Sequence, residues 1–125
     1  MRIFEKDGKV NFVDDFNVLV GYDMRQNCCE HAIWKFTDTP VTKPNTKYLY
    51  GKAPINLDKY RFDPKFFYKG HPESDYETRI AVFRLTPSDT SLPIMYLTLE
   101  NTHNGYYAHG FTVEMGGLEI LADSL

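Results

Sequence analysis

The sequence has little of what marks a membrane, secreted or nucleic-acid-binding protein. No window approaches the roughly 20 apolar residues that a membrane-spanning helix needs, and residues 1–8 lack the apolar core of a signal peptide. The basic residues are scattered; the densest region holds only Lys43, Lys47 and Lys52, and the formal net charge is −3. Such a charge distribution does not neutralise a nucleic-acid backbone. We therefore expect a cytoplasmic protein that binds neither membranes nor nucleic acid.

Cysteine is also scarce. The only two, Cys28 and Cys29, are adjacent, and the side chains of neighbouring residues diverge too far to form a disulfide readily. Free thiols fit a reducing compartment. The chain lacks the paired ligand motifs of structural zinc sites, and it has no glycine-rich phosphate-binding motif. No cofactor is predicted.

Aromatic residues, in contrast, are abundant at 15%, with nine Tyr and nine Phe, and they suit strand surfaces and interfaces. A chain of 125 residues fits one domain, residues 1–125, that can bury a core without disulfides. Short alternating segments between turn residues predict a mainly β fold. We expect an antiparallel sandwich, or a strongly curved sheet approaching a partial barrel, with about seven or eight strands and one short helix.

The clearest local signal lies in Ile94–Met115. Asn104-Gly105 stands between two alternating β-prone runs and is typical of a hairpin turn. A three-residue loop ending in Gly105 gathers the apolar residues of both runs on one face, whereas a two-residue loop splits them between two faces. The preferred register therefore pairs Leu97 with Phe111, Met95 with Val113 and Leu99 with His109.

Several other segments predict strands. Asp7-Gly8 indicates an opening hairpin that pairs Ile3 with Phe12 and Glu5 with Val10. Alternation of Phe16, Val18, Val20 and Tyr22 then predicts a third strand of a meander. Residues 32–36 favour a strand over a helical turn, and residues 76–86, apolar on both faces, favour a central strand. The tail after Gly116-Gly117 is either an edge strand or a helical turn.

The middle of the chain, residues 37–75, is marked by prolines that leave no room for a long regular element. Within it, Asp63–Tyr68 predicts a short helix, with Asp63 as the cap and Pro64 at the first helical position. The rest is expected to be a long loop. Such a loop either holds its shape by aromatic packing or serves as a lid or partner-binding surface.

Side chains capable of chemistry gather at two places, the Cys28–His31 segment and the turn of the 94–115 hairpin. A metal site or a cysteine nucleophile with a histidine partner requires the segment to fold over the turn. The alternative is structural: one cysteine is a small core residue, and Asn101 and His109 are satisfied by each other, by backbone groups or by water. The candidate binding residues are Cys28, Cys29, Glu30, His31, Asn101, His103, Tyr107 and His109.

The same two places carry a resemblance. In Asn17–His31 and His103–Phe111 the chain resembles an uncharacterised group of small bacterial and phage-borne proteins, which pair a Cys-Cys-Glu segment with a later Asn-Gly-Tyr-Tyr turn. The resemblance does not extend to the middle loop. It implies that the two segments belong to one feature, and it implies no activity.

An acidic chain with aromatic faces, a long loop and no catalytic signature favours a non-enzymatic binding protein, of the inhibitor or immunity type, whose partner is another protein. The exposed side of the hairpin, with Tyr96, Tyr106 and His103, is an expected interface. The alternative is a small metal-binding protein or a Cys/His-dependent enzyme that uses the Cys28–His31 loop and the His103–His109 turn. A third hypothesis is a protein that sequesters a small ligand.

Overall fold

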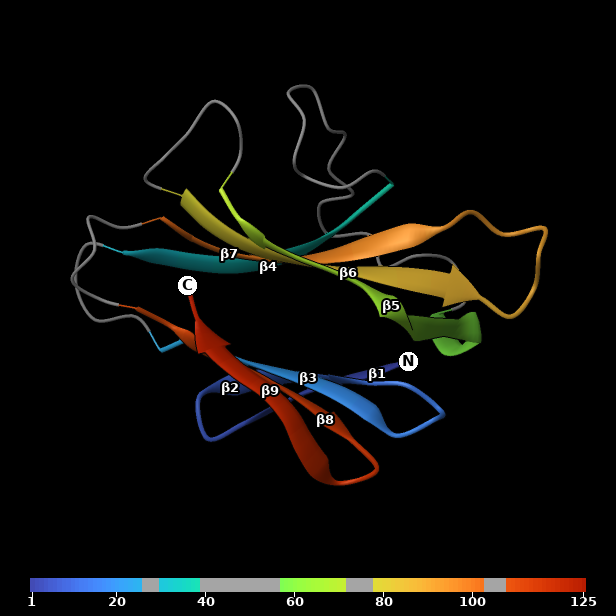
Figure 1. Cartoon of the computed structure of the whole chain (residues 1–125), viewed down its shortest axis with the longest axis horizontal. Coiled ribbons are helices and arrows are strands. Elements are labelled where there is room, and N and C mark those ends of the chain that lie inside the picture. Colours follow the sequence, from blue (N-terminus) through green and yellow to red (C-terminus); the bar gives the residue numbers. More distant parts are fainter. Residues whose placement is uncertain (26–29, 39–56, 72–77, 103–107) are drawn as a thin grey trace.

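Two antiparallel sheets make up the protein, which confirms the mainly β class (Figure 1). The computed structural model describes residues 1–25, 30–38, 57–71, 78–102 and 108–125. Nine strands and one 3₁₀ helix lie within these residues. They are β1 (Arg2–Lys6), β2 (Lys9–Val13), β3 (Val18–Asp23), β4 (His31–Thr37), η1 (Leu57–Lys59), β5 (Tyr60–Gly70), β6 (Thr78–Pro87), β7 (Met95–Thr102), β8 (Gly110–Met115) and β9 (Leu118–Ser124).

The first sheet has the strand order β1-β2-β3-β8-β9. Its opening meander confirms the predicted pairs, Ile3 with Phe12 and Glu5 with Val10. Asp7 and Gly8 both have positive φ, 54° and 78°, as a tight two-residue hairpin turn requires. Of the two structures expected for the tail, the edge strand is the correct one, because β9 pairs with β8 and ends the sheet.

The second sheet has the order β4-β7-β6-β5. The strand predicted over residues 32–36 is confirmed as β4, and β6 is central, as its apolar faces indicated. Both faces of β6 are buried: Ala81 and Phe83 belong to the core between the sheets, whereas Ile80 and Val82 are buried on the outer face.

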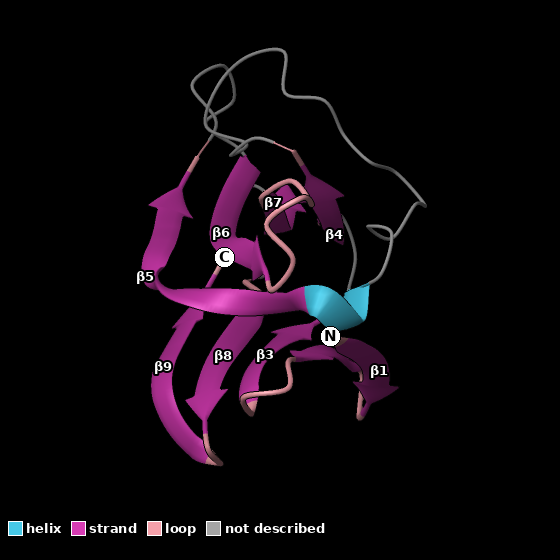
Figure 2. Cartoon of the chain, turned by 90° about the vertical axis from the view of Figure 1, so that its right-hand side faces the viewer, coloured by secondary structure: helices cyan, strands magenta, loops and turns pink. Residues whose placement is uncertain are grey.

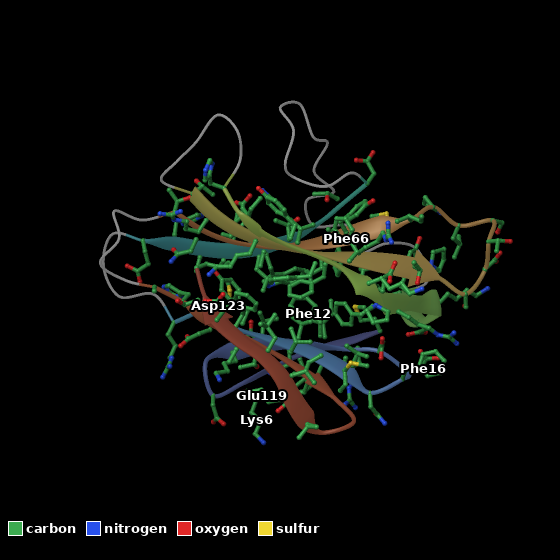
Figure 3. All side chains as sticks on the ribbon, viewed as in Figure 1. Lys6, Phe12, Phe16, Phe66, Glu119 and Asp123 are labelled. Carbon is green, nitrogen blue, oxygen red and sulfur yellow. The ribbon has the colours of Figure 1, made fainter. Side chains whose placement is uncertain are left out.

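The two sheets face each other across one aromatic-rich core (Figures 1 and 3). Phe12 of the first sheet packs edge-on against Trp34 of the second, with ring centroids 5.1 Å apart. Phe83 and Phe111 make a similar contact at 6.2 Å. Such contacts bury large apolar area from both layers at once, so they hold the sheets together.

Asp14 adds a polar connection between the sheets. This buried residue lies between β2 and β3, and its Oδ1 accepts hydrogen bonds from the main-chain N–H groups of Phe16 and Val18 at 3.0 and 2.9 Å. Its Oδ2 accepts a third, from the Phe62 N–H of β5, at 3.0 Å. One carboxylate therefore shapes a turn of the first sheet and anchors an edge strand of the second.

The hairpin predicted over residues 94–115 is wrong. Its two strands, β7 and β8, lie in different sheets: β7 pairs with β4 and β6, and β8 pairs with β3 and β9. The predicted pairs of Leu97 with Phe111, Met95 with Val113 and Leu99 with His109 are therefore absent. The inward faces were nevertheless right, because Leu97 and Phe111 are both buried in the core. In a sandwich both sheets turn their apolar faces to the same core, so alternation does not distinguish a hairpin from a crossing between sheets. The Asn104-Gly105 turn lies outside the described residues.

The short helix predicted over residues 63–68 is also wrong, and with it the expectation that residues 37–75 hold no long regular element. These residues belong to β5, which pairs with β6 through Tyr60–Phe62 and again through Phe67–Gly70, with a shift of register between them. Asp63 does accept a hydrogen bond from the Lys65 N–H, at 2.8 Å, but in a bulge. An aspartate that bonds two residues ahead occurs in turns as well as at helix starts. Pro64 fits the unpaired bulge because it has no N–H to offer the sheet.

None of the helices in the described residues is long and apolar enough to cross a membrane.

Candidate functional site

Two of the residues predicted from the sequence, Glu30 and His109, meet in a buried pair. The His109 Nε2 atom lies 3.2 Å from the Glu30 Oε1, and its Nδ1 lies 2.6 Å from the main-chain oxygen of Asp23. The Asp23 oxygen can only accept, so Nδ1 carries a proton and donates it. Nε2 then either accepts from a protonated Glu30 or donates, as an imidazolium, to the Glu30 carboxylate. The pair is neutral overall in both cases, which suits its full burial.

A second set of bonds surrounds this pair. The main chains of His109 and Leu125 exchange two hydrogen bonds of 2.9 Å, and the Asn101 Nδ2 donates to the Leu125 oxygen at 3.0 Å. Nearby, the Tyr22 hydroxyl donates to the Glu100 main-chain oxygen at 2.6 Å and so joins the two sheets. Burial raises the pKa of this hydroxyl well above its ordinary value of 10, and the Glu100 charge adds to the effect. Tyr22 therefore remains a donor at any physiological pH.

The arrangement of the pair is structural rather than reactive. Both nitrogens of the His109 ring are engaged, so neither is free to take a proton from a nucleophile. His31, in contrast, is exposed on β4 opposite Thr102. Within the part of the chain that the structure describes, no group of three or more His, Cys, Asp or Glu could hold a metal ion. The remaining candidates, Cys28, Cys29, His103 and Tyr107, lie outside the described residues.

A groove that the sequence analysis did not predict is lined by residues of both sheets, including the edge strands β5 and β9. These two strands lie on the same side of the protein (Figure 2). The volume of the groove is about 220 Å³, and its walls are almost wholly apolar. The Lys69 Nζ and the Asp123 Oδ2, 2.8 Å apart, bridge the two edge strands β5 and β9. The groove is lined by Val18, Val20, Phe62, Asp63, Pro64, Phe66, Phe67, Phe83, Val113, Met115, Ile120 and Leu121.

Two irregularities of strand pairing shape this groove. The bulge in β5 lets Phe67 turn toward the core, where its ring lies 5.3 Å from that of Phe83, while Phe66 packs on Tyr96. In β9, Glu119 pairs with Glu114 and Leu121 with Val113, so that Ile120 is the extra residue. Bulges re-aim side chains, and here Ile120 and its neighbour Leu121 both line the groove.

Apolar side chains on the rim of the groove are left in solvent. Ile120 is 54% exposed, and Phe67 and Met115 are also exposed. Leu118, which pairs with Met115 but does not line the groove, is 70% exposed. Single exposed apolar residues are common, but a group around a concave apolar surface marks an interaction site. The interface predicted from the sequence around Tyr96, Tyr106 and His103 is not part of this group. Tyr96 is half-buried against Phe66, and Tyr106 and His103 lie outside the described residues.

The β5 rim of the groove is stabilised by an ion pair. Arg84 donates to the Asp63 Oδ2 from Nη2 at 2.6 Å and from Nε at 2.9 Å. The Lys65 N–H, and then the Arg84 guanidinium, hold the pKa of Asp63 below its ordinary value of 3.8. The guanidinium also lies 4.9 Å from the Phe66 ring centroid. Asp63 thus connects the bulge to β6.

This pKa predicts an acid-sensitive contribution to stability. Because the pKa of Asp63 is lower in the folded chain than in the unfolded chain, its ion pair stabilises the fold above pH 3.8 and is lost as the pH falls through the lower, folded-state value. Asp63→Asn should therefore lower the urea midpoint at neutral pH and have little effect once the wild-type carboxylate is protonated. Equal losses at both pH values would show that the amide disturbs the bulge itself.

The groove residues were missed because they come from edges that are distant in sequence. The available signal was the exposed alternation of Leu118 and Ile120 beyond the Gly116-Gly117 turn, which by itself indicates only an edge strand. No family model, no curated protein and no solved structure matches this chain.

Proposed function

We propose that this is a non-enzymatic binding protein that holds a segment of another protein in the groove between β5 and β9. The observation that carries the proposal is the apolar groove with exposed Phe67, Met115 and Ile120 at its rim. An apolar side chain of the partner that enters the groove removes its own surface and the rim from water. As an inhibitor or immunity protein, in the cytoplasm, the chain would act by stoichiometric occupation of its partner.

The size of the groove favours a protein partner over a small ligand. Sites for small molecules and cofactors usually enclose roughly 300–1,000 Å³, and this groove offers about 220 Å³. That space suits one anchoring side chain, whereas the exposed rim offers further contact to the polypeptide on either side of the anchor. Protein interfaces are commonly built in this way, with a buried apolar anchor and a surrounding rim.

The groove can be tested by removing one exposed side chain. We expect Ile120→Ser to weaken the binding of peptides selected on the wild-type chain from a displayed library by about tenfold or more, because burial of an isoleucine contributes about 2 kcal/mol. Ile120 is 54% exposed, so the fold should be preserved. Titration calorimetry with the selected peptides gives the change in Kd.

Ile94→Ser is the matched control, because Ile94 is a similarly exposed isoleucine, at 46%, that does not line the groove. It should leave the Kd unchanged. Equal weakening by both substitutions, or selected peptides that ignore Ile120, would contradict the assignment of the groove. Circular dichroism of both variants establishes that they fold.

A further inference from the structure

The outer edge of β9 is open for pairing before Asp123, whose side chain is bridged to Lys69 of β5. β9 ends the first sheet, and among the described residues only β8 pairs with it. Unpaired N–H and C=O groups along an edge strand are a template for another strand, and many proteins bind extended peptides in this way. The rim residue Ile120 belongs to this same strand, so a segment that pairs with β9 would also lie along the groove.

β9 has a bulge at Ile120 and the acidic residues Glu119 and Asp123, but it lacks the lysine and proline that most often keep an edge strand from pairing. Two of the other sheet edges carry exposed lysine: Lys6 on β1, and Lys65 and Lys69 on β5, which also has Pro64 in its bulge. On the fourth edge, β4, Lys35 is buried and pairs with Glu100 of β7. Lysine and proline at an edge prevent pairing with other chains. β9 contains neither, and its apolar residues are exposed. Compared with β1 and β5, β9 is therefore the edge better suited to accept a strand.

The charge on β8 and β9 is of one sign. Glu114 and Glu119 are directly opposite each other across the β8–β9 pair, and among the described residues neither makes an ion pair. The sequence has no Lys or Arg after Arg84. Like charges that face each other across a strand pair are unfavourable, so a cation beside them would be stabilised. The charge of this edge therefore complements a basic partner.

We propose that the partner adds an extended strand to the free edge of β9, with an apolar side chain in the groove and a Lys or Arg beside the Glu114–Glu119 pair. This inference rests on the proposed function and names the chemistry of the partner: alternating apolar and basic residues in an extended segment of another protein. Apolar anchoring supplies affinity, and the acidic pair selects among apolar segments by charge.

A second copy of the chain fits this edge less well. A copy of β9 would bring its own Glu119 and Asp123 and no basic residue. An antiparallel pairing centred on Leu121, for example, would place Glu119 opposite Asp123 in both directions. The charge of β9 therefore favours a basic partner over self-association.

The test compares random peptides selected by display on the wild-type chain and on two charge variants. Glu119→Lys places a cation opposite Glu114 within the β8–β9 hairpin and removes the need for one from the partner, whereas Glu5→Lys makes the same change of charge on exposed β1. We expect wild type and Glu5→Lys to enrich Lys and Arg alternating with apolar residues. Glu119→Lys should lose that preference and bind the wild-type-selected peptides about tenfold more weakly. Hydrogen exchange should show slowed β9 amides in the complex.

Each other result overturns the inference. Selected peptides that depend on Ile120 but show no basic preference would leave the proposed function standing and remove the charge selection. Slowed exchange of β5 amides instead of β9 amides would show that the partner binds the edge of β5. A dimer seen in sedimentation and lost in Glu119→Lys would make the occupant a second copy. Failure to select any peptide would count against both the inference and the proposed function.

Discussion

Asp14→Ala is expected to lower the free energy of unfolding by about 3 kcal/mol, because it leaves three main-chain N–H groups without their acceptor. One of them, the Phe62 N–H, is buried where water cannot replace the carboxylate. The others belong to Phe16 and Val18, whose positions define the entry into β3. Urea denaturation followed by circular dichroism measures the loss, and Asp14→Asn, which keeps one acceptor, should fall between wild type and alanine.

The neighbouring residue is the control. Asp15 is exposed and pairs with Arg61 at 3.1 Å, and exposed ion pairs contribute little to stability. Asp15→Ala should therefore leave the denaturation midpoint within experimental error of wild type. If the two alanine variants lost equal stability, the effect would belong to the charge of the loop and not to the hydrogen bonds of Asp14.

His109→Ala is expected to destabilise the fold by about 3 kcal/mol or more, because it removes two hydrogen bonds of a buried ring and leaves a cavity in its place. The substitution takes from Glu30 its bond to the ring and from the Asp23 oxygen its donor. A double variant, Glu30→Leu/His109→Leu, should recover part of the loss because the buried carboxyl group is then replaced by an apolar side chain. Thermal and urea denaturation of the three proteins give the comparison.

His31→Ala is the control for the loss of a histidine near Glu30, since His31 is exposed. It should leave the stability unchanged. If His109→Ala were as stable as wild type, the pair would not be structural, and the hypothesis of a Cys/His-dependent site would gain support. The effect of Cys28→Ser on any bound metal would then be the next measurement.

Local signals predicted the parts of the fold that depend on neighbouring residues. Asp7-Gly8 specifies its turn by conformation alone, so the register of β1 and β2 followed directly. The strand character of β7 and β8 was equally clear from alternation. Which sheet each strand joins was not, because Leu97 and Phe111 point into the same core from opposite layers. Pairing across layers depends on the whole chain.

The candidate site was predictable only in part for the same reason. Glu30 and His109 were singled out by residue type, and the structure brings them together, although their geometry is that of a buried connection. The groove is formed in part by Phe67 of β5 and Ile120 of β9. The bulges that orient both side chains cannot be recognised from the alternation of apolar and polar residues in the sequence. Because residues 63–68 of β5 were predicted to form a helix, the β5 side of the groove could not be recognised from the sequence.

The first sheet combines strands from both ends of the chain, and this affects the order in which the protein assembles. β3 pairs with β8, so that Val18 meets Met115 and Val20 meets Val113, although the whole second sheet lies between them in the chain. During synthesis the β1–β3 meander emerges early, and the edge of β3 that pairs with β8 stays uncovered until β8 is made. Contacts between distant residues form slowly, and uncovered strand edges are where nascent chains aggregate. A newly made chain is therefore most exposed to misassembly in the interval before β8 pairs with β3.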